Sequence, residues 1–354
     1  MEKKPISKKI LSYTLRTLLV ILITVVILVA SLYCLLFILA KGPSPTLSRT
    51  FVLTVKETSA GGFLADMFFT QQEINDILDS SANTDAPNVN IDSSLIELPG
   101  NNGETDDIGN DVGNTGEEDD ESGIEVINIK KNTFNGKLMI VKDPSRVFVA
   151  IPPKGYGEDK SGLSVKKLIS TYDAAGGINA GGFDDPDGQG TGGIPEGFVI
   201  YEGELVWDET EGRSFSVVGF DKNHILHVGS MTAERAIERE LQYAVCFGPS
   251  LIINGTPRNE KGSLGGGMNP RTAIGQRADG AILMLVANGR QIDSLGATYD
   301  DLIDVMMEYG AINAANLDGG SSSLMILNDE NLTTSAYIFG ERIVPNAILV
   351  KKND

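Results

Sequence analysis

The chain has 354 residues, a formal net charge of -19, two cysteines and two histidines. Its length exceeds that of a typical domain and predicts a core domain with appendages. The lone Cys34 and Cys246 make an intrachain disulfide unexpected, and so few Cys and His ligands exclude a zinc site. The acidity is local, because residues 57–129 hold 18 of the 48 acidic residues and no Lys or Arg. That segment is therefore not expected to bind nucleic acid.

The N-terminus predicts one transmembrane helix. Residues 18–40 read LLVILITVVILVASLYCLLFILA, about 35 Å of helix against a bilayer core of about 30 Å. A cleaved signal peptide is the alternative, but its apolar region is shorter, about 7–15 residues. Residues 1–17 form a basic tail that should stay cytoplasmic. We therefore expect a single-pass signal-anchor in the cell membrane, with the rest of the chain extracytoplasmic.

Two different segments follow the predicted anchor. Residues 41–79 form a membrane-proximal element that holds, from residue 51, an extended piece and then a helix with apolar residues at helical spacing. Residues 80–123 are rich in Asn, Asp, Gly and Ser and contain no aromatic residue. This composition is typical of a disordered acidic linker. Its acidic stretches do not have the spacing of an EF-hand calcium loop.

Residues 124–354 predict an α+β domain of several mostly antiparallel sheets with a few packed helices. Strand-like alternation runs through GIEVINIKKNTFNGKLMIVKDPSRVFVAI. Further strands are expected in EGFVIYEGELVW, SFSVVGF, HILHVG, VCFGPSLIING and RTAIGQRADGAILMLVANGRQ. A short helix is expected within residues 164–177. A second is expected over residues 298–310, where Thr298 and Asp301 form a capping box and Gly310 ends the helix.

The stretch NLDGGSSSLM, residues 316–325, joins this second helix and its following strand to another apolar run. Asn316 and Asp318 leave the same face of a strand because they are two residues apart. The glycines that follow permit positive φ, and successive N–H groups there can form an anion-binding nest. From this motif alone, an anionic site and a simple hairpin turn are equally good interpretations.

Two further clusters favour a functional site. GGINAGGFDDPDGQGTGGIPEG, residues 176–197, is a glycine-rich stretch that lets backbone approach a ligand closely; a surface loop is the alternative. GGGMNPRTAIG, residues 265–275, places Arg271 at the start of a strand. Arginine suits bidentate phosphate recognition, although a lone Arg at a strand start is often structural.

Together these clusters resemble the phosphodiester glycosidase family. The resemblance rests on NAGGF, FGPSLIING, PRTAIG and NLDGGSSS, which occur in the order of the family and cover about residues 124–351. Two details depart from the family pattern: GGSSS stands where GGGSS is common, and NAGGFDD where NGGFF-like forms occur. The resemblance implies hydrolysis of a sugar-1-phosphodiester to a sugar and a phosphomonoester, with no cofactor required.

Roles for individual residues follow as a hypothesis. A phosphomonoester is a good leaving group and needs charge stabilisation more than a proton, which Arg271 and the turn could supply. Asp318 would act as nucleophile or as base, and Asn179 and Asn316 would orient sugar hydroxyls. The expected catalytic residues are Asp318, Arg271 and Asn179, and the expected substrate-binding residues are Gly181, Gly182, Phe183, Thr272, Asn316, Gly319, Gly320, Ser321 and Ser322.

Other chemistries fit less well. His224 and His227 would point to opposite faces of a strand, no G-x-S-x-G is present, and no P-loop motif is present. A Ca²⁺ site at Asp184, Asp185 and Asp187 is a minor option, because hard oxygen ligands gather there. The alternative of another class is a membrane-anchored module that binds phosphorylated cell-wall or capsule polysaccharide without cleaving it.

Overall fold

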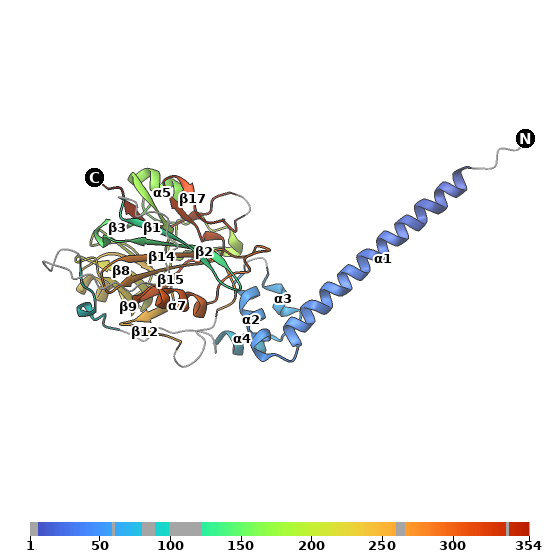
Figure 1. The fold of residues 1–354 in the computed structure, drawn as a ribbon, viewed down its shortest axis with the longest axis horizontal. Coiled ribbons are helices and arrows are strands. Elements are labelled where there is room, and N and C mark those ends of the chain that lie inside the picture. Colours follow the sequence, from blue (N-terminus) through green and yellow to red (C-terminus); the bar gives the residue numbers. More distant parts are fainter. Residues whose placement is uncertain are drawn as a thin grey trace, which may run out of the picture.

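The structure, a computed structural model, describes residues 6–58, 61–79, 89–98, 122–259, 266–337 and 340–353, with side chains of residues 6–12, of Asp79 and of Asp187 left aside. The described part is a mixed helix and sheet protein whose paired strands are antiparallel. This confirms the predicted α+β class. A long helix projects from one side of the domain and carries the N-terminus (Figure 1).

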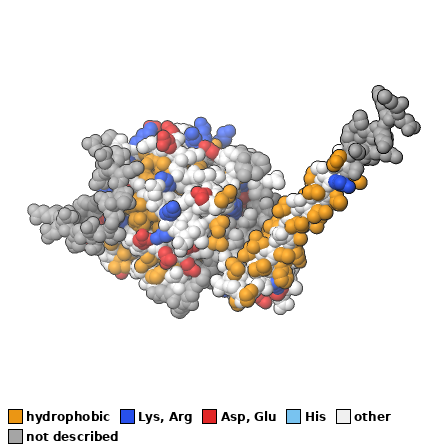
Figure 2. Space-filling model, turned by 45° about the vertical axis from the view of Figure 1, so that its right-hand side comes forward, with side chains coloured by type: hydrophobic (Ala, Val, Ile, Leu, Met, Phe, Trp, Pro, Cys, Tyr) orange, Lys and Arg blue, Asp and Glu red, His pale blue; other side chains and the backbone are white. Residues whose placement is uncertain are grey.

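The projecting helix is α1 (Ile6–Lys41). Its part Tyr13–Lys41 is long and apolar enough to cross a membrane, with a mean hydropathy of 3.0, and none of its most apolar window is buried. Apolar side chains cover the helix along its visible length (Figure 2). By length and composition, α1 is therefore a candidate membrane anchor or signal sequence.

Three short helices connect α1 to the domain: α2 (Pro45–Lys56), α3 (Phe63–Asp66) and α4 (Gln71–Asp79). The extended piece expected from residue 51 is instead the second half of α2. The Ser44 side chain accepts a hydrogen bond from Leu47 N, and Pro45 occupies the first turn, so both helix-start signals are present. Phe51 and Val52 face inward and pack with Ile74 of α4. Tertiary burial thus favours the helix over the extended piece that was expected.

The largest sheet has seven strands in the order β1 (Ile124–Lys130), β2 (Asn135–Val141), β14 (Ile282–Ala287), β13 (Arg271–Arg277), β15 (Ala311–Leu317), β11 (Ser250–Ile253) and β12 (Thr256–Pro257). Helix α7 (Tyr299–Glu308) begins at the predicted capping box of Thr298 and Asp301. Its buried face, Leu302, Ile303, Val305 and Met306, packs in one cluster with residues of β13, β14 and β15.

Two five-stranded sheets complete the core. One has the order β7 (Glu204–Asp208), β6 (Phe198–Tyr201), β10 (Leu241–Cys246), β8 (Phe215–Asp221) and β9 (Leu226–Met231). Helix α6 (Ala233–Glu238) connects β9 to β10 in the chain. The other has the order β17 (Glu330–Asn331), β16 (Met325–Leu327), β5 (Ala174–Asn179), β19 (Ala347–Lys351) and β3 (Val147–Ala150), with α5 (Val165–Tyr172). β18 (Ile343–Val344) pairs with β4 (Leu163–Ser164).

The three sheets share one apolar cluster. It joins Met139 and Ile274 of the seven-stranded sheet to Ile178 of β5 and Val218 of β8. Because side chains from all three sheets bury one another, the strand ends at the edges of this core are held in fixed relative positions. The site described below lies at one such edge.

Part of the predicted acidic linker lies along the domain. In residues 89–98, Asp92 N donates to Asn254 Oδ1 at 2.9 Å, and Asn254 Nδ2 donates to Asn90 O at 3.0 Å. Ile96 is buried, and Glu97 N donates to Ala278 O at 2.6 Å. This stretch includes the short 3-10 turn Ser93–Leu95. The remaining linker residues, 80–88 and 99–121, lie outside the described residues.

Candidate active site

A cavity of about 260 Å³ opens where β15 ends, β13 begins and β14 leads into a loop. The turn after β15 forms one wall, and the C-terminal end of α2 forms another. Its lining residues are Glu57, Asp185, Phe247, Asn269, Arg271, Arg290, Tyr299, Asp318, Gly319, Gly320, Ser321 and Ser322. The cavity thus brings together Asp318, Arg271 and four residues of the glycine–serine turn, as the sequence predicts.

The backbone of Asp318 is fixed by hydrogen bonds to Asn179, the last residue of β5, and to Ala180, which follows it. Its N–H donates to Ala180 O at 2.9 Å, and its carbonyl accepts from Asn179 Nδ2 at 2.6 Å. Asn179 Oδ1 in turn accepts from Thr272 Oγ1 at 2.8 Å and from Leu324 N at 3.1 Å. Asn179 and Thr272 have no exposed surface. The structure therefore places both residues beneath the cavity, where they support the backbone of Asp318.

The Asp318 carboxyl group is a weaker acid than an ordinary aspartate side chain. Desolvation by the surrounding protein raises its pKa from 3.8 to about 7, although hydrogen bonds from the Ser322 hydroxyl and the Gly319 amide favour the ionised form. Asp185 and Arg342 are close enough to act on it with opposite signs. A carboxyl group with this pKa changes its charge near neutral pH, as an acid, base or nucleophile often does.

The turn after Asp318 satisfies most of its own amides. Gly320 adopts a φ of 59°, and its N–H donates to Pro270 O at 2.8 Å. Gly319 N–H bonds to the Asp318 carboxylate, and Ser322 N–H donates to Gly319 O at 3.1 Å. Ser321 lines the cavity, and its N–H has no partner among the described residues. The predicted anion nest is therefore largely occupied by the carboxylate and carbonyls of the protein itself.

Arg271 is buried and almost fully bonded. Its Nη2 donates to Glu57 Oε2 at 2.6 Å and to Gly267 O at 2.8 Å. Its Nη1 donates to the Tyr299 hydroxyl at 3.2 Å, and its Nε to Ala297 O at 3.3 Å. Desolvation opposes its charge, but Tyr299 and Glu57 outweigh that effect and raise the pKa of Arg271. The guanidinium is thus a fixed cation with an internal carboxylate partner.

Glu57 and Arg290 are cavity residues that sequence reasoning missed. Glu57 caps the C-terminal end of α2, and its carboxylate also accepts from Asn269 Nδ2 at 2.7 Å and Gly267 N at 3.2 Å. Arg290 follows β14 and has a φ of 58°. The Asn-Gly pair before Arg290 marks a turn, but nothing in that pattern indicates that the turn faces Asp318.

The glycine-rich stretch lies beside this cavity. Gly181 N donates to Asn346 Oδ1 at 2.7 Å, and a Cβ on Gly182 would lie 2.4 Å from Glu196 Oε2 and 2.7 Å from the Phe247 ring. Phe183 lies under the Arg342 guanidinium at 5.1 Å. Close packing therefore explains the glycines here.

Asn316 is buried within the same region, where its Nδ2 donates to Gly248 O at 2.7 Å. Its Oδ1 has no partner among the described residues. The structure places it below the cavity lining. Its expected contact with sugar hydroxyls stays a prediction.

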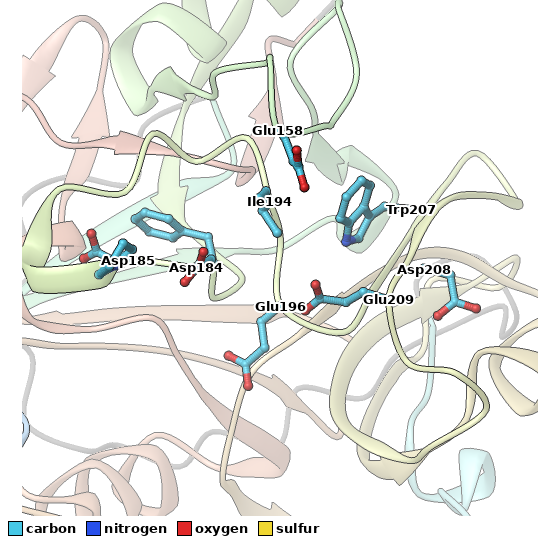
Figure 3. Close-up of a pocket in the computed structure, with 10 residues that line it drawn as sticks. Glu158, Asp184, Asp185, Ile194, Glu196, Trp207, Asp208 and Glu209 are labelled. Atoms are coloured by element: carbon cyan, nitrogen blue, oxygen red, sulfur yellow. The ribbon is translucent and has the colours of Figure 1, made fainter.

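A second cavity of about 820 Å³ adjoins the first, and Asp185 lines both. Glu158, Glu196, Glu209 and Trp207 surround it (Figure 3). Asp184 lines it as well, whereas the Asp185 carboxylate is bonded to Arg342 and Gly190 N. Among the described residues, no group of three His, Cys, Asp or Glu is arranged to hold a metal ion, and the Asp187 side chain lies outside them.

Comparison with known proteins supports an assignment at the level of the family. The fold is an α+β domain, and Asp318 with its raised pKa shares one cavity with Arg271 and Arg290. The model of the phosphodiester glycosidase family matches residues 172–351, which is half of the chain. The chain belongs to the phosphodiester glycosidase family, and this membership makes it a hydrolase.

Individual relatives are distant. The chain is 24% identical over 216 residues to the mouse N-acetylglucosamine-1-phosphodiester alpha-N-acetylglucosaminidase, covering 54% of this chain and 40% of that protein. It is 35% identical over 94 residues to the SPbeta prophage-derived uncharacterized protein YomE of Bacillus subtilis, covering 26% and 15%. The chain thus spans less than half the length of either relative.

A solved structure supports the fold. The catalytic domain of the zebrafish N-acetylglucosamine-1-phosphodiester alpha-N-acetylglucosaminidase, auto-inhibited by its pro-peptide, aligns with a TM-score of 0.53 and 21% identity. The alignment covers 66% of this chain and 83% of the zebrafish chain. At this identity the match shows a shared architecture.

Proposed function

We propose that the protein hydrolyses a glycosyl-1-phosphodiester, giving a free sugar and a phosphomonoester. The observation that carries this proposal is the Asp318 carboxyl group, with a pKa of about 7, in one cavity with the Arg271 and Arg290 guanidinium groups. The name of the mouse relative supports an N-acetylglucosamine-1-phosphodiester as the first substrate to test.

The proposed reaction breaks the bond between the sugar C1 and the phosphate oxygen. The departing phosphomonoester keeps the electron pair of that bond, and water adds to C1. Ionised Asp318 either takes the proton of the attacking water or first bonds to C1 as nucleophile. An arginine guanidinium of the cavity stabilises the negative charge of the leaving phosphate, so no strong general acid is needed at that oxygen.

The proposed setting is the outside of a cell membrane. The apolar helix α1 supports anchoring, and the basic residues ahead of it support a cytoplasmic N-terminus. A domain held in this way meets envelope polysaccharide or exopolysaccharide that carries sugar-phosphate diesters. These are the proposed natural partners.

The test uses the full chain in lipid nanodiscs with an α-N-acetylglucosamine-1-phosphodiester. Free sugar and phosphomonoester should appear together and should be lost in Asp318→Asn. Asp173→Asn is the matched control, because Asp173 is an exposed carboxylate that pairs with Lys352. A parallel sample with chelator tests the Ca²⁺ option, which predicts loss of release on metal removal.

One outcome would reject the assigned role of Asp318, and a second would reject the proposed hydrolysis itself. Release that persists unchanged in Asp318→Asn would remove Asp318 from the chemistry. Absence of release across a panel of sugar-1-phosphodiesters, together with retained binding of phosphorylated polymer, would favour the non-catalytic binding module.

A further inference from the structure

The two arginines of the cavity differ in how many of their N–H groups are already used in hydrogen bonds within the protein. Arg271 uses four of its five N–H groups on Glu57, Gly267, Ala297 and Tyr299, and 5% of its surface is exposed. The carboxylate of Glu57 already balances its charge at 2.6 Å. An incoming phosphate would have to displace this carboxylate to form a comparable ion pair with Arg271.

Arg290 is bonded far more loosely. Its Nη2 donates to Asn269 Oδ1 at 3.1 Å and to Thr58 Oγ1 at 3.4 Å, and both acceptors are neutral. Its Nε and Nη1 have no partner among the described residues, and no carboxylate lies within ion-pair distance of it there. Desolvation and the neighbouring Arg271 lower the pKa of Arg290, and the more distant Glu57 carboxylate offsets part of this effect. Among the described residues this cation therefore has no carboxylate in direct contact, and a bound anion would supply one.

The position of Arg290 suits a group attached to the reacting carbon. A Cβ placed on Gly320 would lie 3.4 Å from Arg290 Nη2 and 3.7 Å from its Nη1, so the guanidinium lies against the glycine turn that follows Asp318. Ser321, the turn residue whose N–H has no partner among the described residues, lines the same cavity. The guanidinium fork and this amide can together bind two oxygens of one phosphate.

The backbone at Arg290 supports a functional role. Its φ of 58° lies in the left-handed region, which non-glycine residues rarely adopt and which is enriched at ligand sites. Its N–H donates to Leu295 O at 3.1 Å, which holds the turn in this conformation. The strain is therefore maintained by the surrounding loop and directs the side chain to the cavity.

We propose that Arg290 is the residue that binds the phosphate group of the substrate, and that Arg271 with Glu57 is a clamp that holds the end of α2 against the cavity. This assignment rests on the proposed function for the identity of the anion. It gives the two arginines separate tasks, with ligand binding at Arg290 and positioning at Arg271.

The test measures inorganic phosphate binding to the full chain in nanodiscs by calorimetry, beside the KM for the phosphodiester. Arg290→Gln should weaken phosphate binding and raise KM by about tenfold or more, the loss expected for a charge-assisted hydrogen bond. Arg290→Lys should recover part of the affinity because it keeps the charge. Arg277→Gln is the matched control, since Arg277 pairs with Asp279 at the far turn of β13.

Glu57→Gln separates the two arginines. If Arg290 binds the phosphate, removal of the Glu57 charge should leave the affinity equal or slightly tighter. Phosphate binding that tightens at least tenfold in Glu57→Gln and does not change in Arg290→Gln would overturn the assignment in favour of Arg271. Wild-type protein that binds no phosphate would also overturn it.

Further measurements guard against ambiguous results. Thermal unfolding of each variant identifies loss of folding, and Arg290→Asn provides a second variant whose side chain tolerates positive φ. Diester hydrolysis with an unchanged KM in Arg290→Gln would reject the assignment and keep the proposed function. Phosphate binding that depends on Arg290, without hydrolysis of any diester, would keep the assignment of Arg290 and reject the proposed function.

Discussion

The turn at residues 316–323 and the segment at residues 54–58 contribute to the same cavity, but only the first has a conspicuous sequence. The turn concentrates one carboxylate, two glycines and three serines. The segment reads TVKET and resembles any amphipathic helix end. Yet most turn amides bond within the protein, whereas Glu57 reaches Arg271 from 214 residues away. A local motif therefore locates a site, while its complete set of charges depends on tertiary packing.

The largest effect is expected on turnover, from a substitution in the turn at residues 316–323. Asp318→Asn should lower turnover by about 10²- to 10⁴-fold, the range for loss of a general base, and by more if Asp318 is the nucleophile. Since the Asp318 pKa is about 7, wild-type kcat/KM should rise with pH around that value if the ionised form acts. A pH–rate profile measures this directly. A rate that instead falls as pH rises through 7 would assign Asp318 the role of an acid.

The free energy of unfolding should also depend on the ionisation of Asp318. It should fall as the pH rises, whereas the activity should rise. The folded pKa of Asp318, about 7, lies above the ordinary 3.8, so the unfolded chain loses this proton first as pH rises. The free energy of unfolding should therefore fall as the pH rises from about 4 to about 7, by about 1.4 kcal/mol for each pH unit in that interval, and then stay level.

Asp318→Asn lacks this titration. The stability of the variant relative to wild type should grow from pH 4 to 7 by up to a few kcal/mol. Denaturant unfolding at pH 4.5 and pH 8 measures the difference. Equal pH dependence in both proteins would contradict the raised pKa.

A smaller effect, on stability and hydrogen exchange, is expected where α2 contacts the loop at residues 266–269. A Cβ on Gly267 would lie 2.2 Å from Thr54 N, so Gly267→Ala should separate α2 from the cavity loop at a cost of about 1–3 kcal/mol. Met268 N, which donates to Thr54 Oγ1 at 3.0 Å, should then exchange its hydrogen faster. Hydrogen exchange of residues 266–269 is the measurement, with Gly62→Ala as control because Gly62 has a φ of -54° and a Cβ there would come no closer than 3.8 Å to Lys56. Unchanged protection would show that the contact is dispensable.

The smallest effect concerns the hydrogen bond from Ser322 to Asp318. This bond lowers the pKa of Asp318, so Ser322→Ala should move the acidic limb of kcat/KM to higher pH by up to about one unit. The plateau rate should change less than in Asp318→Asn. A limb that moves to lower pH would be inconsistent with the donor role of Ser322.

Much of the fold could be predicted because its signals are local. The capping box at Thr298 marks the start of α7, and short apolar stretches mark the strands on both sides of the Asp318 turn. Helix α2 was harder, because the β-branched residues of FVLTVKE favour a strand while Ser44 and Pro45 indicate a helix start. Helix α6 is too short to give a clear periodic signal.

The site could be predicted less completely. Asp318 and Arg271 stand in distinctive motifs, but the isolated Arg290 after an Asn-Gly turn resembles a solvated loop residue. Its importance depends on the lack of a carboxylate partner among the described residues, which only the packed chain reveals. The catalytic and substrate-binding roles assigned to Asn179 and its neighbours remain predictions.

The attachment of α2 changes what the acidic linker can do. Only residues 42–44 separate α1 from α2, and Phe68 stacks on Tyr33 of α1 with ring centroids 5.7 Å apart. The linker begins after α4, beyond the point where Glu57 meets Arg271. If α1 spans a bilayer, the height of the cavity above the lipid is therefore set by the short helices. Such a domain meets substrates only in a thin layer next to the membrane, which it covers by lateral diffusion. A longer linker would not move the cavity further from the lipid.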